Sequence, residues 1–156
     1  MIEFELLRKG APDAGIAPER STTGAVGYDI LMPSSGSIRP YLNIPVTVRL
    51  GFKLKIPYGH GGVIIPRGSA GTKYGLTLAN TTGLIDPDYT GEWILKLLAR
   101  GPKTITWVRG DRLCQFSIVP MRTDPLIEVT EGTIETTERG DGAFQSTGLN
   151  TFTIDK

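Results

Sequence analysis

The chain is expected to fold as an all-β protein, a sandwich or barrel of many short strands. Twenty glycines and eleven prolines interrupt short apolar segments along its 156 residues. Turn-bounded strands of this kind are typical of sandwiches and barrels. Residues 46–56 also alternate between apolar and mostly polar positions, which predicts one buried and one solvent-facing side. The apolar positions of this segment are Val46, Val48, Leu50, Phe52, Leu54 and Ile56.

Further strands are expected wherever an apolar segment lies between turn residues. In chain order these are residues 4–7, 62–65, 93–99, 104–108, 114–119 and 126–129. Prolines interrupt most longer stretches and exclude long helices, so a single turn at Ser69–Tyr74 is the one helix expected. From about residue 130 the chain is polar. Residues 1–130 are therefore predicted to form the β domain, and residues 131–156 an extended linker and mobile C-terminal arm.

Composition excludes several classes of protein. A net charge of +1 argues against nonspecific binding to nucleic acid or to membranes. Cys114 is the only cysteine and His60 the only histidine, so a metal would bind through oxygen ligands, which favours Mg²⁺. The N-terminus lacks a basic region followed by an apolar run, and no apolar run reaches membrane-spanning length. A cytoplasmic protein is expected, or a nuclear one in a eukaryote, and not a secreted one.

The most informative segment is Gly83–Gly91, in which two aspartates and a tyrosine lie between two glycines. Strand-like sequence flanks it on both sides, and Pro87 fixes φ within it, so the segment is predicted to be a β-hairpin. Such a hairpin can hold a base or sugar against Tyr89 while Asp86 handles a proton or a water. The alternative is an ordinary acidic turn, and composition alone favours that alternative because Asp, Pro and Gly are common in turns.

Four other segments occur around this hairpin in a fixed order. The whole set is Val26–Ile30, Pro66–Gly75, Gly83–Gly91, Arg109–Gln115 and Arg139–Gly148. Together they resemble the five motifs of the trimeric dUTP pyrophosphatases (dUTPases). The resemblance extends from about residue 25 to residue 148. Each motif alone is weakly specific, whereas five in order at family-like spacing are strongly specific.

The resemblance implies a jelly-roll-like distorted β-barrel that forms a homotrimer with active sites shared between subunits. It implies hydrolysis of dUTP to dUMP and pyrophosphate with Mg²⁺, by attack of water on the α-phosphate. That reaction would limit uracil incorporation into DNA and supply dUMP for dTMP synthesis. Direct binding of nucleic acid is not expected.

The resemblance also assigns roles within the hairpin. Asp86 corresponds to the catalytic aspartate, and a carboxylate within hydrogen-bond reach of a water can take its proton. Tyr89 resembles the ring that packs against deoxyribose and excludes a 2′-hydroxyl by shape. Asn80 resembles the asparagine that binds the uracil edge, since its amide offers both a donor and an acceptor. Backbone groups near Gly83 and Leu84 would complete uracil recognition.

Phosphate contacts are implied at two other motifs. Arg67 offers a planar set of donors, and the glycine-rich turn at Gly68 and Ser69 exposes backbone N–H groups. This turn departs from the family, which usually has serine where Gly68 stands, so a backbone N–H or Ser69 must take over that role. Gln115 resembles the glutamine that contacts phosphate. Asp29 resembles the aspartate that helps to hold Mg²⁺ through water.

The last motif resembles an arm that closes over bound nucleotide. Phe144 would stack on uracil, Arg139 would meet the γ-phosphate, and Gln145, Ser146 and Thr147 would contact the nucleotide. The family usually has glycines where this chain has Ala143 and Gln145.

Two alternatives share the expected fold. A dCTP deaminase carries a catalytic glutamate five residues after the closing glycine of the hairpin. Counted from Gly91, that position is Lys96, and an ammonium group cannot serve as the base. The other alternative is a regulator with the dUTPase fold that acts through protein contacts, which the sequence does not exclude.

Overall fold

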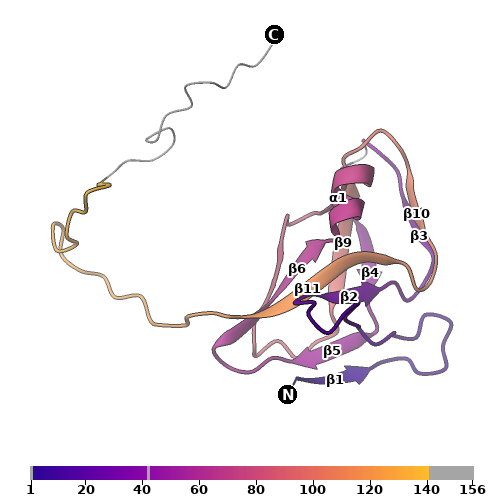
Figure 1. Cartoon of the computed structure of the whole chain (residues 1–156), viewed down its shortest axis with the longest axis horizontal. Coiled ribbons are helices and arrows are strands. Elements are labelled where there is room, and N and C mark those ends of the chain that lie inside the picture. Colours follow the sequence, from indigo (N-terminus) through magenta and orange to yellow (C-terminus); the bar gives the residue numbers. More distant parts are fainter. Residues whose placement is uncertain (1, 42, 141–156) are drawn as a thin grey trace, which may run out of the picture. The chain divides into compact units, whose positions relative to one another are not determined.

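The structure, a computed structural model, describes residues 2–41 and 43–140 (Figure 1). It divides into two compact units, residues 1–123 and 124–156. The first unit consists mostly of short strands with one short helix, which confirms the predicted all-β class. In the second unit the described residues 124–140 contain turns and no helix or strand. The boundary predicted at residue 130 between domain and arm stays a prediction.

Eleven strands and one helix are defined in the described part of the chain. They are β1 (Glu3–Leu6), β2 (Tyr28–Leu31), β3 (Gly36–Ile38), β4 (Val46–Arg49), β5 (Phe52–Lys55), β6 (His60–Pro66), α1 (Gly68–Tyr74), β7 (Leu76–Leu78), β8 (Gly83–Ile85), β9 (Ile94–Ala99), β10 (Ile105–Trp107) and β11 (Arg112–Pro120). Among these residues, no helix has the length and apolar character needed to cross a bilayer.

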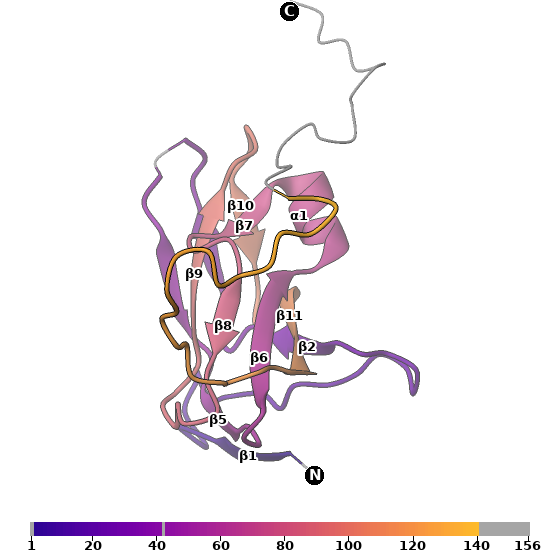
Figure 2. The ribbon, with the colours of Figure 1, turned by 90° about the vertical axis from the view of Figure 1, so that its left-hand side faces the viewer.

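The strands pair antiparallel in four separate sheets. The largest has the order β2-β11-β6-β8, and a second has the order β4-β9-β7. Two-stranded pairs, β1-β5 and β3-β10, complete the set. Figure 2 shows β8, β6 and β11 side by side, and in both views α1 lies at the end of the unit opposite β1 and β5. Within the described residues the four sheets do not join into one closed barrel.

A group of aromatic rings forms the centre of the core. Trp93 and Phe52 are fully buried, and their ring centroids lie 5.6 Å apart. Phe116 on β11 meets Trp93 edge to face at 4.9 Å and stacks on Tyr28 of β2 at 5.2 Å. Aromatic pairs of this kind add about 0.5–1.5 kcal/mol each beyond the burial of their area. The rings therefore join the four-stranded sheet to β5 and to the residue that precedes β9.

The alternation predicted for residues 46–56 is present, but the single strand predicted there is wrong. Val48, Leu50 and Phe52 are buried as expected. Gly51, however, has φ +74°, and a Cβ there would lie 2.4 Å from the Cα of Gly15. The chain bends at this glycine, so β4 pairs with β9 while β5 pairs with β1.

Most of the other predicted elements are present within a few residues. The helix and the strands expected around residues 4–7, 62–65, 93–99, 104–108 and 114–119 are confirmed. The strand predicted at residues 126–129 is wrong: Leu126 is fully exposed, and this apolar segment has no pairing strand in the described part of the chain. Strands β2 and β3 were not predicted, because Asp29 interrupts the apolar pattern of β2 and β3 has only three residues.

Candidate active site

A tight turn between β7 and β8 begins the site. The amide of Thr81 donates to the Leu78 carbonyl at 3.0 Å, and the amide of Thr82 donates to the Asn80 carbonyl at 2.7 Å. Thr81 has φ +63°, a rare conformation for a β-branched residue that costs about 1–3 kcal/mol. Strained backbone of this kind concentrates at functional sites. Thr81 was missed by the sequence analysis, since nothing in the residue type predicts a positive φ.

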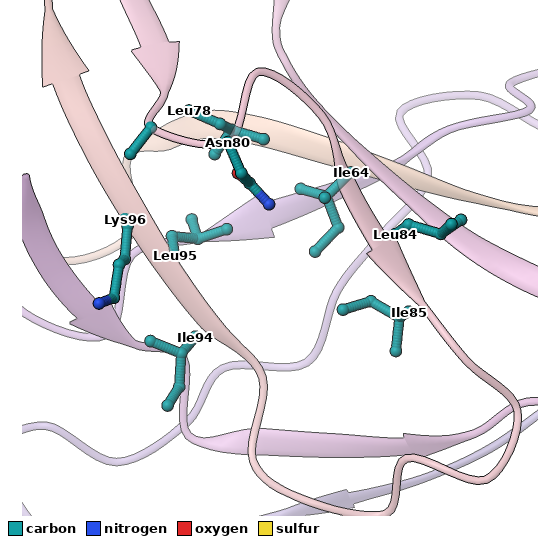
Figure 3. A pocket seen from close by; sticks show the side chains of 10 residues that line it. Ile64, Leu78, Asn80, Leu84, Ile85, Ile94, Leu95 and Lys96 are labelled. Atoms are coloured by element: carbon teal, nitrogen blue, oxygen red, sulfur yellow. The ribbon is translucent and has the colours of Figure 1, made fainter.

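Behind this turn lies a cavity of about 490 Å³ between β6, β7, β8 and β9. Its lining residues are Ile64, Leu78, Ala79, Asn80, Gly83, Leu84, Ile85, Ile94, Leu95 and Lys96. Figure 3 shows the Asn80 amide directed into this space, whereas the side chains of Leu84 and Lys96 point away from it. Small-molecule sites have this size and this combination of apolar walls with few polar groups. The walls and the single inward amide suit a flat ring with polar edges.

The structure brings Asn80, Gly83 and Leu84 together, as the sequence analysis predicted. Strand β8 is held against β6 by pairs that include Ile64 with Gly83 and Val63 with Leu84. At Gly83 a Cβ would lie 3.1 Å from the Cβ of Ile64, so the glycine permits close approach of the two strands. The backbone of Gly83 and Leu84 therefore forms one wall of the cavity.

Asp86 and Tyr89 lie in the turn that follows β8, and neither lines the cavity. The amide of Tyr89 donates to the Asp86 carbonyl at 3.2 Å, which closes this turn. The ring of Tyr89 lies over Gly91, where a Cβ would come within 2.7 Å of the ring. Its hydroxyl donates to the Glu92 main-chain carbonyl at 2.8 Å. Asp86 is exposed, so its carboxylate is accessible to a water or a ligand.

Glu92 is a buried carboxylate that the sequence analysis missed. Its side chain is 7% exposed. Arg8 Nη1 lies at 2.7 Å, the Gly51 amide at 2.8 Å and Arg49 Nη2 at 2.5 Å from its oxygens. Burial acts to raise the pKa of Glu92, but the hydrogen bonds from Arg8, Gly51 and Arg49 outweigh it, and the pKa is lowered. No local pattern signals this site, because its donors lie more than 40 residues away in the sequence.

A second polar group surrounds Asp29 on β2. Asp29 is 4% exposed. Its Oδ1 lies 3.1 Å from Arg67 Nε, and its Oδ2 accepts a 3.0 Å hydrogen bond from Ser21 and lies 3.7 Å from Arg112 Nε. Arg112 also pairs with Glu19. We call Asp29, Arg67 and Arg112 the Asp29 cluster. Asp29 and Arg67 were each predicted as site residues, for Mg²⁺ and for phosphate, but their contact and the part played by Arg112 were not predicted.

Gln115 lies beside this cluster. In the four-stranded sheet Asp29 pairs with Gln115, and Gln115 pairs with Ile65. Directly paired residues point to the same face of a sheet, so Asp29 and Gln115 share one face. Gly27 leaves room for the Gln115 amide, since a Cβ there would lie 2.7 Å from Oε1.

Gly68 and Ser69 begin α1 directly after Arg67, and both are exposed. The Arg67 amide donates to the Leu113 carbonyl at 2.9 Å, which ties the end of β6 to β11. A Cβ added at Gly68 would meet no atom within 4 Å. Position 68 therefore has room for a side chain, although its glycine has none.

The remaining predicted site residues belong to the C-terminal motif. Arg139 is described and exposed. Phe144, Gln145, Ser146 and Thr147 lie outside the described residues.

The donors present bear on how a metal ion could bind. Within residues 2–41 and 43–140, no three His, Cys, Asp or Glu side chains lie close enough together to hold an ion. Both carboxylate oxygens of Asp29 already have protein partners. This donor set fits an ion that keeps most of its waters and is held mainly by a ligand's phosphates, as Mg²⁺ commonly is.

The fold and the site together define a class of all-β protein. Its members have a cavity the size of a ring, and strand β6 connects this cavity to a cluster of arginine and aspartate side chains. The family model of dUTPase matches residues 13–148. The chain belongs to the dUTPase family.

Individual relatives agree with this assignment. A protein of Desulfotalea psychrophila named deoxyuridine 5′-triphosphate nucleotidohydrolase is 35% identical over 95% of this chain and 97% of its own length. A protein of the same name from Sinorhizobium medicae is 39% identical over 95% of this chain and 92% of its own.

Solved structures share the fold. The dUTPase of Staphylococcus bacteriophage 80alpha with dUpNHpp has a TM-score of 0.81 at 22% identity, over 96% of this chain and 99% of that one. A mutant dUTPase of S. aureus phage phi11 is described with a structural Mg(II) ion. It has a TM-score of 0.72 at 22% identity, over 86% of this chain and 99% of that one.

Replacing Glu92 with glutamine should lower the free energy of unfolding at pH 7 by about 2–3 kcal/mol, because two arginines lose a buried partner. The folded-state pKa of Glu92 lies below its ordinary 4.5. Its stabilisation is therefore complete above about pH 4.5 and is lost as the pH falls through the folded-state pKa. Urea unfolding at one protein concentration, at pH 7 and below pH 4, measures the free energy of unfolding. The difference in this free energy between wild type and Glu92→Gln should be smaller below pH 4 than at pH 7.

Glu5→Gln is the matched control, since Glu5 makes an exposed pair with Lys53 and such pairs contribute little. Equal losses of unfolding free energy in Glu92→Gln and Glu5→Gln would contradict the role given to the ion pairs of Glu92. A difference between wild type and Glu92→Gln that does not change with pH would contradict it as well.

Proposed function

We propose that the protein hydrolyses dUTP to dUMP and pyrophosphate by attack of water on the α-phosphate, assisted by Mg²⁺. The reaction would limit uracil incorporation into DNA and supply dUMP for dTMP synthesis. The observation that carries the proposal is the Asn80 amide directed into an apolar cavity beside the Gly83–Leu84 backbone. The names of relatives 35–39% identical over nearly the whole chain support it.

Base selection follows from the chemistry of this cavity. An asparagine amide has a donor and an acceptor side by side, as does the edge of uracil. The backbone of Gly83 and Leu84 adds further donors and acceptors. Cytosine exchanges the donor and acceptor positions of this edge, so it would leave polar groups in the cavity unpaired, which discriminates strongly. A closed hairpin would exclude the 5-methyl group of thymine.

Asp86 is proposed as the general base. Asp29 and Glu92 are buried, and arginines occupy their carboxylate oxygens, so neither is placed to act as the base. Asp86 is exposed in the turn between β8 and Tyr89, and from there its carboxylate can take the proton of the attacking water. Tyr89 would lie against the deoxyribose and exclude a 2′-hydroxyl.

The Asp29 cluster and Gln115 are proposed to receive the triphosphate. Arg67 supplies a forked donor for phosphate oxygens, and the amides of Gly68 and Ser69 add backbone donors. Mg²⁺ would be held by the nucleotide's phosphates, with Asp29 in contact through a water. When bound, Mg²⁺ would neutralise phosphate charge and so favour the approach of the water.

We propose a homotrimer with shared active sites. The face that carries Asp29 and Gln115 continues into Ile65 and Leu84, which are 42% and 58% exposed. A subunit packed on these apolar side chains would stand beside the Asp29 cluster and add residues to it. Sedimentation analysis tests this, and a monomer that is fully active would rule it out.

The test of the proposed activity is incubation with dUTP, dCTP, dTTP and UTP in turn, with identification of every product. Pyrophosphate should form from dUTP far faster than from the other three. Ammonia release from dCTP would identify a deaminase instead, although Lys96 stands where that reaction needs a carboxylate and points away from Asn80. Lack of activity on all four nucleotides would favour the alternative of a regulator that has the dUTPase fold and acts through protein contacts.

Asp86→Asn should retain the fold and nucleotide binding while turnover falls by about 10²–10⁴, the usual contribution of a general base. Asp88→Asn is the matched control, because it removes a neighbouring exposed carboxylate from the same turn. Steady-state kinetics with dUTP measure both variants. Unchanged turnover in Asp86→Asn, or an equal loss in Asp88→Asn, would remove Asp86 from this role.

The C-terminal motif is proposed to contact bound nucleotide through Arg139, Phe144, Gln145, Ser146 and Thr147, as an arm separate from the β domain. A chain that ends at Thr137 should keep its oligomeric state and bind nucleotide but hydrolyse it slowly, because contacts to the base and phosphates are lost. Phe144→Ala should show a milder defect of the same kind. A truncated protein that unfolds or dissociates would show that the segment is structural, and unchanged turnover would show that it is dispensable.

A further inference from the structure

Glu92 connects the core of the protein to Tyr89, the ring that the proposed function places against the sugar. We propose that Glu92 is a positioning residue that sets the sugar selectivity of the site by holding Tyr89 in place. The inference rests on the proposed function and adds to it a residue that does not touch the nucleotide.

Both the main chain and the side chain of Glu92 contribute to this connection. Its main-chain carbonyl accepts the hydrogen bond from the Tyr89 hydroxyl at 2.8 Å. Its carboxylate is held by Arg8, Arg49 and the Gly51 amide, all within 2.8 Å. These donors come from two parts of the chain: Arg8 from the segment after β1, and Arg49 and Gly51 from the end of β4 and the bend that follows it. The position of the carbonyl is therefore set by contacts with two segments that are distant in the sequence.

Neighbouring residues remove the remaining freedom. Trp93 is fully buried, its amide donates to the Phe52 carbonyl at 3.0 Å, and its carbonyl accepts from the Leu50 amide at 2.9 Å. On the other side of Glu92, Gly91 lies directly under the Tyr89 ring. The ring is thus supported from below by Gly91 and held at its hydroxyl by Glu92.

A ring held in this way can discriminate by shape. Deoxyribose and ribose differ by one hydroxyl, and a steric clash rejects the larger sugar only if the ring cannot move aside. Loss of the Glu92 carboxylate contacts would let the backbone at residues 91–92 shift and the ring move. Ribonucleotides would then be accepted more readily, whereas base selection at Asn80 would be unaffected.

The experiment compares kcat/KM for dUTP, UTP and dCTP in wild type, Glu92→Gln, Tyr89→Phe and the double variant. In Glu92→Gln the dUTP/UTP ratio should fall about three- to tenfold, the range expected when one hydrogen-bonded constraint is lost. The dUTP/dCTP ratio should stay within about twofold. Tyr89→Phe should lower the dUTP/UTP ratio as well, and adding Glu92→Gln to it should have little further effect. General destabilisation would instead lower all rates and leave the ratios unchanged.

Lys53→Met is the matched control: it removes a neighbouring ion pair with Glu5 and should leave both ratios unchanged. Arg49→Met provides a second variant should Glu92→Gln fail to fold, since Arg49 is 62% exposed, and it should lower the dUTP/UTP ratio about two- to threefold. Unchanged ratios in the folded variants, or a full effect of Glu92→Gln in the Tyr89→Phe background, would overturn the inference. A wild type inactive on dUTP would overturn the proposed function and this inference together, whereas an active wild type with unaltered selectivity in the variants would overturn the inference alone.

Discussion

The pairing of β6 with β11 on one side and β8 on the other is the constraint on which the site depends. Ile64 of β6 lines the cavity and pairs with Gly83 of β8. Three residues further on, Arg67 follows the end of the same strand and binds Asp29. The cavity and the Asp29 cluster are therefore held at a separation fixed by one extended segment. A ligand with a base at one end and phosphates at the other requires such a fixed separation, since misplacement of either end would misdirect the attacking water.

The side chains of Asp29, Asp86 and Glu92 differ in environment, and this difference favours different roles. Asp29 and Glu92 are buried and bound by arginines, and these ion pairs hold several chain segments together. Asp86 lies exposed in a turn. Buried paired carboxylates position other groups, and an accessible carboxylate is able to exchange protons with water. The environment of each residue thus favours the same division of roles that the motif resemblance implies.

The sequence predicted those parts of the fold and site that depend on neighbouring residues. The alternation from Val46 to Ile56 correctly identified the buried side chains. The strands predicted on either side of Gly83–Gly91 pair with each other as β7 and β9, but Gly83–Ile85 pairs with β6 instead of lying in a hairpin turn. The bend at Gly51 was not predictable, because it depends on the backbone of Gly15 lying against it. The partners of Glu92 lie 84 residues away at Arg8 and 41 residues away at Gly51. Contacts over such distances leave no local pattern, and for the same reason the apolar residues at 126–129 resembled a strand without having a partner.

We propose that the site holds the base and directs a water at the α-phosphorus. Hydrolysis of dUTP in heavy-oxygen water, followed by mass spectrometry of both products, tests it directly. Attack at the α-phosphorus forms the new P–O bond on the nucleotide, so the label should appear in the phosphate of dUMP and be absent from pyrophosphate. Label in pyrophosphate would mean attack at the β-phosphorus and would contradict the proposed placement of Asp86 and the water.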